Sequence, residues 1–389
     1  MGCGSSSTPA PVVERERKVT VTVLPPRSPA ASSYDSADYD SPRPRSNSAI
    51  RARVSLGGGG DSVSRKMGKL IDGDKDLSTN IHPAVFEATA VVITDLYNKG
   101  VVLSYDRAAE ILTKYQKACQ VAETHFPGSR DGKIILRQAK DIMTRKGFDR
   151  ENTLFAQSVC ADEINHDVND ITNLFASFLG EPFHLGGLAG IPFTGKTGFG
   201  AYAAHVPDDG YLFIMFSPHI GISESLQLGK FTRSGQIYEG HACGAAIGAL
   251  NYCIEGKPIP DNAKLGASPL DYQMSYIITQ VAKVVDEIVA LETENERQAE
   301  LTRQMYKISK TFLDGIVDMG ITDLHGKPVK IAILGGIQIN MPRPMADFFA
   351  PLFFQVFEEG KPPEDLLQET FFNDPVSKEL LSSLQDTLS

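Results

Sequence analysis

Apolar residues recur in two kinds of pattern from about residue 80 onward. Spacing of three to four residues predicts helices at 83–98, 104–125, 133–146, 167–179, 245–254 and 271–318. Short, nearly continuous apolar runs predict buried strands at 153–159, 211–216 and 329–333, the last of them ending in Gly335-Gly336. Strands separated by helices indicate an α/β fold with a central, mostly parallel sheet flanked by helices.

Residues 1–75 lack any such pattern. Ser, Pro, Arg and Gly dominate, and only residues 19–23 alternate as a strand does. This composition is typical of a segment that cannot bury enough apolar surface to fold. We therefore predict a disordered N-terminal tail over residues 1–75 and a single α/β domain over residues 76–389.

The first six residues, Met-Gly-Cys-Gly-Ser-Ser, fit the N-myristoylation pattern, with Gly2 as the acceptor. Cys3 is a candidate for palmitoylation, and two acyl chains hold a protein to a membrane more firmly than one. We expect an intracellular protein with membrane association through acylated Gly2 and Cys3. The alternative is a targeting peptide for a plastid or another organelle, because the segment is rich in Ser and Arg, although its acidic residues argue against this.

Charge and cysteine content narrow the classes of partner. The net charge of −10 argues against nucleic-acid binding, which needs a basic surface. No apolar run reaches the length of a membrane span. The five cysteines are odd in number and widely spread, which does not suggest a disulfide framework and favours a reducing compartment.

Residues 190–197 match the phosphate-loop pattern G-x-x-x-x-G-K-[ST]. That site needs a strand before the loop and a helix after it, so that backbone amides face the phosphates. Residues 181–187 make a poor strand, and the glycines and proline within 198–207 argue against a helix. The strand at 211–216 also ends without the acidic residue that would hold magnesium. We therefore disfavour nucleotide binding and interpret the stretch as a glycine-rich wall of a site for a small ligand.

Cys160 and His219 each stand just past a predicted strand. Ligands of open α/β sheets bind beyond the carboxyl ends of the strands, so the two residues are expected to converge. Cys243 precedes a predicted helix, whose N-terminus favours the thiolate. Two thiolates and one imidazole form a set of three zinc ligands that leaves the fourth coordination position open for water. Each residue alone is more often structural, and His241 competes with His219, because it lies on the same side as Cys243 in an extended segment.

Charged residues near these ligands suggest further roles. Asp162 and Glu163 closely follow Cys160, and an acid at this distance can orient a water on the metal. Arg233 is the candidate partner of this acid, because a planar guanidinium binds a carboxylate in two places. The alternative for each residue is an ordinary surface charge.

Five motifs in chain order resemble one known family. They are C-A-D-E-I-N-H at 160–166, the glycine-rich stretch at 186–200, H-V-P-D-D-G at 205–210, P-H-I-G-I-S at 218–223 and A-C-G-A-A at 242–246. Together they resemble the limiting-CO2-inducible (LCIB-type) proteins, also described as theta-type carbonic anhydrases. The resemblance implies a β-carbonic-anhydrase-like fold, a homodimer, zinc on Cys160, His219 and Cys243, and Asp162 as the acidic active-site residue.

Two positions depart from the β-class motifs. The motif C-x-D-x-R has arginine where this chain has Ile164, and the motif H-x-x-C has cysteine where it has Ile222. Both groups must come from elsewhere in the chain. We expect Arg233 and Cys243 to supply them.

The resemblance implies a carbonic anhydrase, a lyase in which metal-bound hydroxide converts CO2 to bicarbonate. We expect CO2 to lie against Phe193, Phe199 and Phe231. His205 is a candidate proton shuttle, because imidazole titrates near neutrality, and its alternative is a structural histidine. The rival function is a non-catalytic zinc-binding scaffold or a bicarbonate-sensing protein.

Overall fold

The computed structural model describes residues 21–22, 55–56, 82–99, 101, 104–166, 170–261, 270–320 and 330–373. The chain divides into two compact units, Met1–Thr113 and Lys114–Ser389. The predicted boundary near residue 75 and the acylation site at Gly2 and Cys3 lie outside the described residues. So does the predicted disordered tail, apart from four residues.

The first unit holds the two helices that begin the periodic part of the chain. These are α2 (Pro83–Asn98) and the start of α3 (Tyr105–His125), which confirm the helices predicted there. The four residues described from the N-terminal segment form a short antiparallel pair, β1 (Val21–Thr22) with β2 (Ser55–Leu56).

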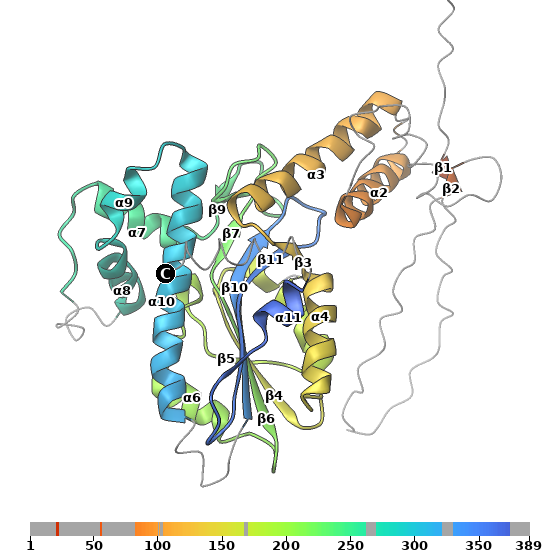
Figure 1. The fold of residues 1–389 in the computed structure, drawn as a ribbon. Coiled ribbons are helices and arrows are strands. Elements are labelled where there is room, and N and C mark those ends of the chain that lie inside the picture. Colours follow the sequence, from red (N-terminus) through yellow and green to blue (C-terminus); the bar gives the residue numbers. More distant parts are fainter. Residues whose placement is uncertain are drawn as a thin grey trace, which may run out of the picture. The chain divides into compact units, whose positions relative to one another are not determined.

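An eight-stranded sheet forms the centre of the second unit (Figure 1). Its strands are β3 (Arg130–Asp131), β4 (Thr153–Val159), β5 (Phe183–His184), β6 (Tyr211–Ser217), β7 (His219–Gly221), β10 (Lys330–Asn340), β11 (Phe348–Phe357) and β12 (Glu364–Asp365). The order is β12-β11-β10-β6-β4-β5, with β3 beside β11 and β7 beside β10. Neighbours from β10 to β5 run parallel, whereas β11 is antiparallel to β10. The α/β fold with a mostly parallel sheet is thus confirmed.

Helices cover both faces of this sheet (Figure 1). One layer contains α4 (Gly132–Arg145), α5 (Ile171–Leu179) and α11 (Leu367–Phe371). The other contains α6 (Gly195–Ala203), α7 (Gly244–Ile254), α8 (Tyr272–Val281), α9 (Val285–Val289) and α10 (Glu294–Gly320). Because β6 is covered on both sides, its residues from Leu212 onward are all buried, which explains its continuous apolar run.

The last parallel strand runs further than its sequence indicated. We predicted an end at Gly335-Gly336, but β10 continues to Asn340. A side chain at Gly335 would collide with the ring of Phe216, and one at Gly336 with the carbonyl of Ala350. The register with β11 also shifts between the two glycines, so the pair marks a bulge rather than a strand end. The extension carries Asn340 alongside β7.

The long helical region predicted at 271–318 is three helices, α8, α9 and α10. The start of α10 is fixed by a reciprocal cap between Thr293 and Glu296. The backbone N–H of Glu296 donates to Oγ1 of Thr293 at 3.2 Å, and the N–H of Thr293 donates to Oε2 of Glu296 at 2.8 Å. This T-x-x-E pattern is a capping box, a signal in the sequence that marks the break.

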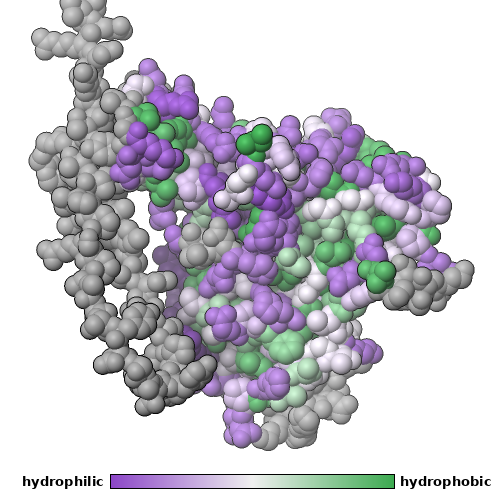
Figure 2. Space-filling model, turned by 180° about the vertical axis from the view of Figure 1, so that it is seen from behind, coloured by the Kyte–Doolittle hydropathy of each residue, from purple (hydrophilic) through white to green (hydrophobic). Residues whose placement is uncertain are grey.

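No helix in the described part of the chain is both long enough and apolar enough to cross a bilayer. On the face drawn in Figure 2, hydrophobic residues lie in patches among hydrophilic ones. Exposed large hydrophobic residues of the second unit include Ile254, Leu270 and Tyr272, near the ends of α7 and α8. Membrane association through Gly2 and Cys3 stays a prediction.

Asp170 caps helix α5 with a carboxylate that is itself fully buried. Its Oδ1 accepts hydrogen bonds from the backbone N–H groups of Thr172, at 2.5 Å, and Asn173, at 3.0 Å. Burial raises the pKa of Asp170 from 3.8 to about 7, against the lowering effect of these two bonds. The folded protein therefore holds a proton here that the unfolded chain has already lost. The stability that this proton contributes is lost as the pH rises from about 4 through about 7.

We expect Asp170→Asn to raise the free energy of unfolding at about pH 8 by on the order of 1–3 kcal/mol, because the amide keeps a capping oxygen and carries no buried charge. At about pH 4 the gain should vanish, because the wild-type carboxyl is then protonated. Urea denaturation at the two pH values measures the difference. A variant that loses more stability at the higher pH than at the lower would contradict this account of Asp170.

Candidate metal centre

Cys160, His219 and Cys243 converge where parallel strands end. Cys160 directly follows β4, and His219 begins β7, two residues after the end of β6. Strands β4 and β6 are adjacent and parallel, so their carboxyl ends lie side by side. The three potential ligand atoms, two Sγ atoms and one ring nitrogen, lie within 4.8 Å of one another, and all three residues are buried.

The segment that carries Cys243 is held against β7 by backbone hydrogen bonds. A short hairpin of β8 (Lys230–Phe231) and β9 (Gly240–His241) precedes it. The N–H of Gly221 donates to the carbonyl of Ala242, and the N–H of Ala242 donates to the carbonyl of Gly229, each at 3.0 Å. Cys243 then caps α7 in an extended conformation. These contacts bring Cys243 to Cys160 across 83 residues of sequence.

The two thiols form a hydrogen-bonded pair, with 3.7 Å between the Sγ atoms. A hydrogen bond from Cys243 holds the pKa of Cys160 well below its ordinary value, against the opposing effect of burial, and the nearby His219 lowers it further. The same bond, together with burial, raises the pKa of Cys243. One thiol of the pair thus favours the negative charge that a metal ligand needs.

His219 presents one ring nitrogen to the two thiols. Its Nδ1 lies 2.8 Å from Oδ1 of Asn340. Its Nε2 is buried and has no hydrogen-bond partner among the described residues. Burial is the largest single influence and acts to lower the pKa of His219, but the negative charges of Cys160 and Asp162 and the bond to Asn340 act together to raise that pKa. A buried nitrogen without a partner is costly unless something else satisfies it.

A metal ion held by the three residues would satisfy that nitrogen. Two sulfur donors and one imidazole nitrogen within 4.8 Å are the ligand types of a three-ligand zinc site with an open fourth position. The unpartnered Nε2 of His219 points to the same conclusion. These residues form a candidate metal site, and their chemistry fits zinc.

Asp162 lies beside this site and is clamped by Arg233. The Nη2 atom of Arg233 donates to both carboxylate oxygens of Asp162, at 2.9 Å and 3.0 Å. Its Nε donates to Glu163 at 2.6 Å, and its Nη1 to the carbonyl of His241 at 3.1 Å. The Oδ2 atom of Asp162 is 3.8 Å from Nε2 of His219. The guanidinium therefore holds a carboxylate next to the unpartnered ring nitrogen.

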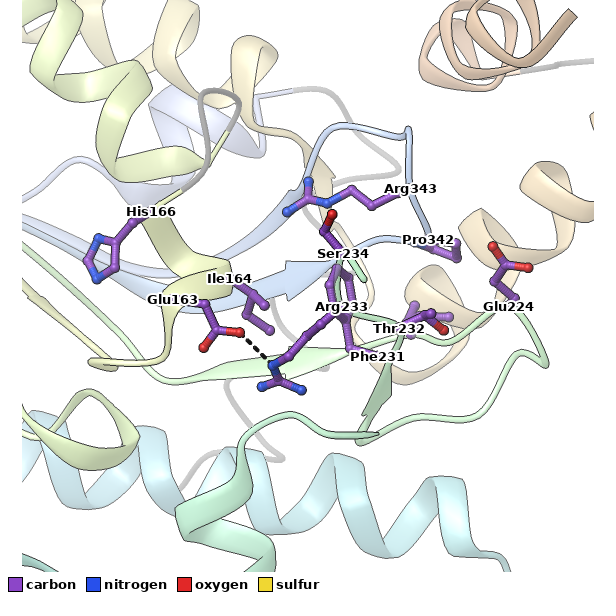
Figure 3. A pocket seen from close by; sticks show the side chains of 11 residues that line it. Glu163, Ile164, His166, Glu224, Phe231, Thr232, Arg233, Ser234, Pro342 and Arg343 are labelled. Atoms are coloured by element: carbon purple, nitrogen blue, oxygen red, sulfur yellow. Dashed lines mark hydrogen bonds and ion pairs between the residues drawn. The ribbon is translucent and has the colours of Figure 1, made fainter. Parts of the chain in front are cut away.

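A pocket of about 600 Å³ lies beyond Arg233. Figure 3 shows Arg233 reaching from the loop after β8 to Glu163, which stands on the short 3₁₀ helix η1 (Glu163–His166) after β4. Ile164, Phe231 and Arg343 also line the pocket. Cys160, His219 and Cys243 do not line this pocket. Arg233 lines it and also holds Asp162 beside these three residues.

Residues 132–358, more than half of the chain, match the family of limiting CO2-inducible proteins B/C beta carbonic anhydrases. The chain belongs to this family. The crystal structure of PtLCIB4, a homolog of the limiting CO2-inducible protein LCIB, is similar with a TM-score of 0.57 and 28% identity, covering 64% of this chain and 98% of that chain. The crystal structure of a serine-to-arginine mutant of PtLCIB4 is similar with a TM-score of 0.53 and 27% identity, covering 64% of this chain and 98% of that chain. The crystal structure of the limiting CO2-inducible protein LCIB matches with a TM-score of 0.47 and 20% identity, covering 62% of this chain and 96% of that chain. None of the curated proteins matches this chain.

The family resemblance predicted from the five motifs is therefore confirmed, and all five lie within the matched residues. The structure also brings together the four residues that this resemblance implied, Cys160, His219, Cys243 and Asp162. Arg233, predicted as the partner of Asp162, contacts it directly. The catalytic roles of these residues and the homodimer stay predictions.

His241, the alternative ligand, is not part of the cluster. It lies in β9 opposite Lys230, and its side chain is exposed, whereas Cys243 is buried. The chain turns from β9 into α7 at this point, so the alternation of an extended segment does not persist from 241 to 243. His241 instead contributes its backbone carbonyl to the Arg233 clamp.

His205 is also not brought to the cluster. Its exposed ring contacts Phe183, with 6.5 Å between ring centroids. Phe183 pairs with Ala156, four residues before Cys160 along β4, which places it about 13 Å back along the strand. The expected role of His205 as a proton shuttle therefore has no geometric support.

The three phenylalanines expected to face CO2 separate in the structure. Phe231 is buried with Ile164 and with Ala242, the residue before Cys243. Phe193 packs against the apolar cluster that contains Cys160 and Cys243. Phe199 instead lies on α6 against Tyr202, which bonds to backbone carbonyls of β4 and β6. We therefore remove Phe199 from the candidate apolar wall.

The phosphate-loop pattern at 190–197 needs one correction. We expected no helix after it, but α6 begins within it, at Gly195. Amides that precede this helix are nevertheless occupied, since the N–H of Phe193 donates to the carbonyl of Ile191 at 2.8 Å and that of Gly195 to the carbonyl of Pro192 at 2.9 Å. Amides bonded within the loop do not face a phosphate, and β5 before it has only two residues. Nucleotide binding remains disfavoured.

Three buried polar residues that surround the cluster, Asn165, Asn340 and Asp347, were missed by reasoning from the sequence. Asn165 lies within the motif C-A-D-E-I-N-H, where only Cys160, Asp162 and Glu163 received roles. Asn340 lies beyond the glycine pair that we took as the end of β10. A run of alternating residues, Ile337 to Asn340, was the signal that the strand continues.

Proposed function

We propose that this protein is a zinc-dependent carbonic anhydrase that interconverts CO2 and bicarbonate. The observation that supports the proposal best is the placement of Asp162, held by Arg233 3.8 Å from the unpartnered Nε2 of His219, at the edge of a buried Cys-His-Cys cluster. This combines a metal-ligand set with a positioned hydrogen-bond acceptor. Membership of a family described as carbonic anhydrases points to the same reaction.

Cys160, His219 and Cys243 would hold the metal. Zinc, when bound, makes water a nucleophile near neutral pH. Asp162 would accept a hydrogen bond from this water and so orient it toward CO2. Arg233 keeps the Asp162 carboxylate from rotating, because it donates to both oxygens.

Two aromatic residues are suited to the apolar substrate. Phe193 packs against the apolar cluster that contains both cysteines, and Phe231 is buried with Ala242, the residue before Cys243. CO2 has no net dipole and makes no strong hydrogen bonds, so an apolar surface admits it without an unsatisfied polar group. We propose that these two rings line the approach of CO2.

The proposal is tested by zinc analysis and stopped-flow CO2 hydration on the full-length purified protein. We expect about one zinc ion per chain and a rate well above that of buffer, lost after chelation and restored by added zinc. Stoichiometric zinc with a rate equal to that of buffer would overturn the enzymatic function. That result would favour the rival, a zinc-binding scaffold or a bicarbonate sensor.

A further inference from the structure

Behind His219 lies a chain of buried polar side chains, none of which lines the pocket. Asn340 joins His219 to Asp347, and all three are at most 2% exposed. Nδ2 of Asn340 donates to Oδ2 of Asp347 at 2.9 Å and to Oδ1 of Asn165 at 3.2 Å. Nδ2 of Asn165 lies 3.4 Å from the carbonyl of Cys160. The chain therefore connects two of the three candidate ligands.

The partners of Asn340 decide which way its amide group points. A carboxylate accepts hydrogen bonds and does not donate them, so the NH2 group of Asn340 must face Asp347. Its carbonyl oxygen must then face Nδ1 of His219, 2.8 Å away. An oxygen can only accept, so Nδ1 must carry the ring proton. The lone pair of the neutral ring is left on Nε2, the atom that faces the two thiols.

Asp347 is held in place by several groups at once. Its Oδ1 accepts a hydrogen bond from the backbone N–H of Met341 at 3.2 Å and lies 3.8 Å from Arg343. Its Oδ2 also accepts from Nε2 of Gln338 at 3.3 Å. Gln338 and Asn340 project from the same face of β10, because they are two residues apart in a strand. A buried carboxylate with this many donors is fixed and orients the amide next to it.

We infer that Asp347 and Asn340 are positioning residues that set the tautomer of His219 and so present Nε2 as a metal ligand. The inference rests on the proposed zinc site but not on the proposed reaction. Asn165 extends the same chain to the backbone of Cys160 and so ties the positions of two ligands together. Supporting groups of this kind typically change metal affinity by about 10–100-fold.

The test compares Asn340→Leu with a matched control, Gln157→Met. Gln157 is also a buried amide that bonds to a histidine ring, with 2.6 Å between its Nε2 and Nδ1 of His184, but that pair is outside the cluster. Zinc affinity is measured by competition with a chromophoric chelator. We expect Asn340→Leu to lower it about 10–100-fold and the control to change it less than about threefold.

A second variant guards against loss of folding at position 340. Asp347→Asn has the same shape but can donate, so the Asn340 amide is no longer held in one orientation. We expect about a tenfold loss of zinc affinity. The double variant Asn340→Asp with Asp347→Asn exchanges the two groups and again places only acceptors toward His219. It should return zinc affinity to within about threefold of the wild type, because the two changes are coupled.

Nitrogen-15 NMR of the histidine rings in the zinc-free protein, at a pH where the His219 ring is neutral, provides a readout that loss of packing alone would not change. We expect the proton of His219 on Nδ1 in the wild type and in the double variant, and a mixture of tautomers in Asp347→Asn. Unchanged zinc affinity and an unchanged tautomer in both single variants would overturn the inference and leave the proposed reaction standing. Zinc-loaded wild type that does not hydrate CO2 would overturn the proposed reaction and leave this inference standing.

Discussion

Replacing Cys160 with serine should remove zinc from the protein and abolish CO2 hydration with it. Sulfur bonds zinc at about 2.3 Å as a thiolate, whereas a serine hydroxyl keeps its proton near neutral pH. The Cys160 thiol is the one whose pKa the cluster lowers, so it is the donor best prepared to ligate. Groups that only support ligands already change affinity about 10–100-fold, so we expect a loss of more than about 100-fold here.

The matched control is Cys119→Ser. Cys119 is a buried thiol on α3, and no other cysteine or histidine joins it in a cluster of the described residues. It undergoes the same exchange of sulfur for oxygen, so any general effect on packing appears in both variants. Zinc content by mass spectrometry and stopped-flow rates are measured for both. Full activity in Cys160→Ser would show that the site lies elsewhere, and loss of zinc in Cys119→Ser would show that zinc retention follows stability.

The position of the candidate site was predictable because two of its ligands follow well-defined strands. Thr153–Val159 and the run from Tyr211 are almost wholly buried, because both faces of the sheet are covered. In a parallel sheet such strands end at one edge, so Cys160 and His219 had to lie near each other. Periodicity and strand direction are local properties, and they are sufficient for this inference.

The third ligand and the clamp depend on contacts that no local pattern encodes. Cys243 reaches the cluster because backbone bonds hold the hairpin before it against β7. Arg233 lies in the loop between β8 and β9, and it contacts Asp162, which is 71 residues earlier in the chain. Residue type and the comparison with β-class motifs suggested both, but the alternation that favoured His241 failed where the chain turns into α7.

Glycine was the least reliable signal in this chain. Gly335-Gly336 indicates a strand end in the sequence, although the pair is needed because Phe216 and β11 approach the backbone closely. The glycines after residue 190 argue against a helix, although α6 forms there under tertiary packing. Missing the second half of β10 also hid Asn340, and with it the chain of side chains behind His219.

Asp162→Asn should leave zinc in place and lower the rate of CO2 hydration by about 100-fold. Asp162 is not needed to complete the three-ligand set, so zinc content should not change. Its carboxylate is the acceptor 3.8 Å from Nε2 of His219, and an amide in its place presents a donor on one side. Stopped-flow rates and zinc content, measured on the same preparation, separate the two effects.

Arg233→Gln should lower the rate to a similar extent for a different reason. Without the guanidinium, the Asp162 carboxylate loses two hydrogen bonds and is free to turn toward the metal position. A fourth protein ligand excludes water, so zinc should be held as tightly or more tightly while the rate falls. Glu163→Gln is the control: its side chain is 71% exposed, and an exposed ion pair contributes only about 0–1 kcal/mol.

Combining Asp162→Asn with Arg233→Gln shows whether the two residues act as one unit. Each single variant already breaks the same pair, so the double variant should be about as slow as the slower single variant, not slower by the product of both effects. Multiplicative losses would mean that Arg233 contributes through another contact, such as the carbonyl of His241. Zinc that is lost from Asp162→Asn would instead make Asp162 a ligand in the resting protein.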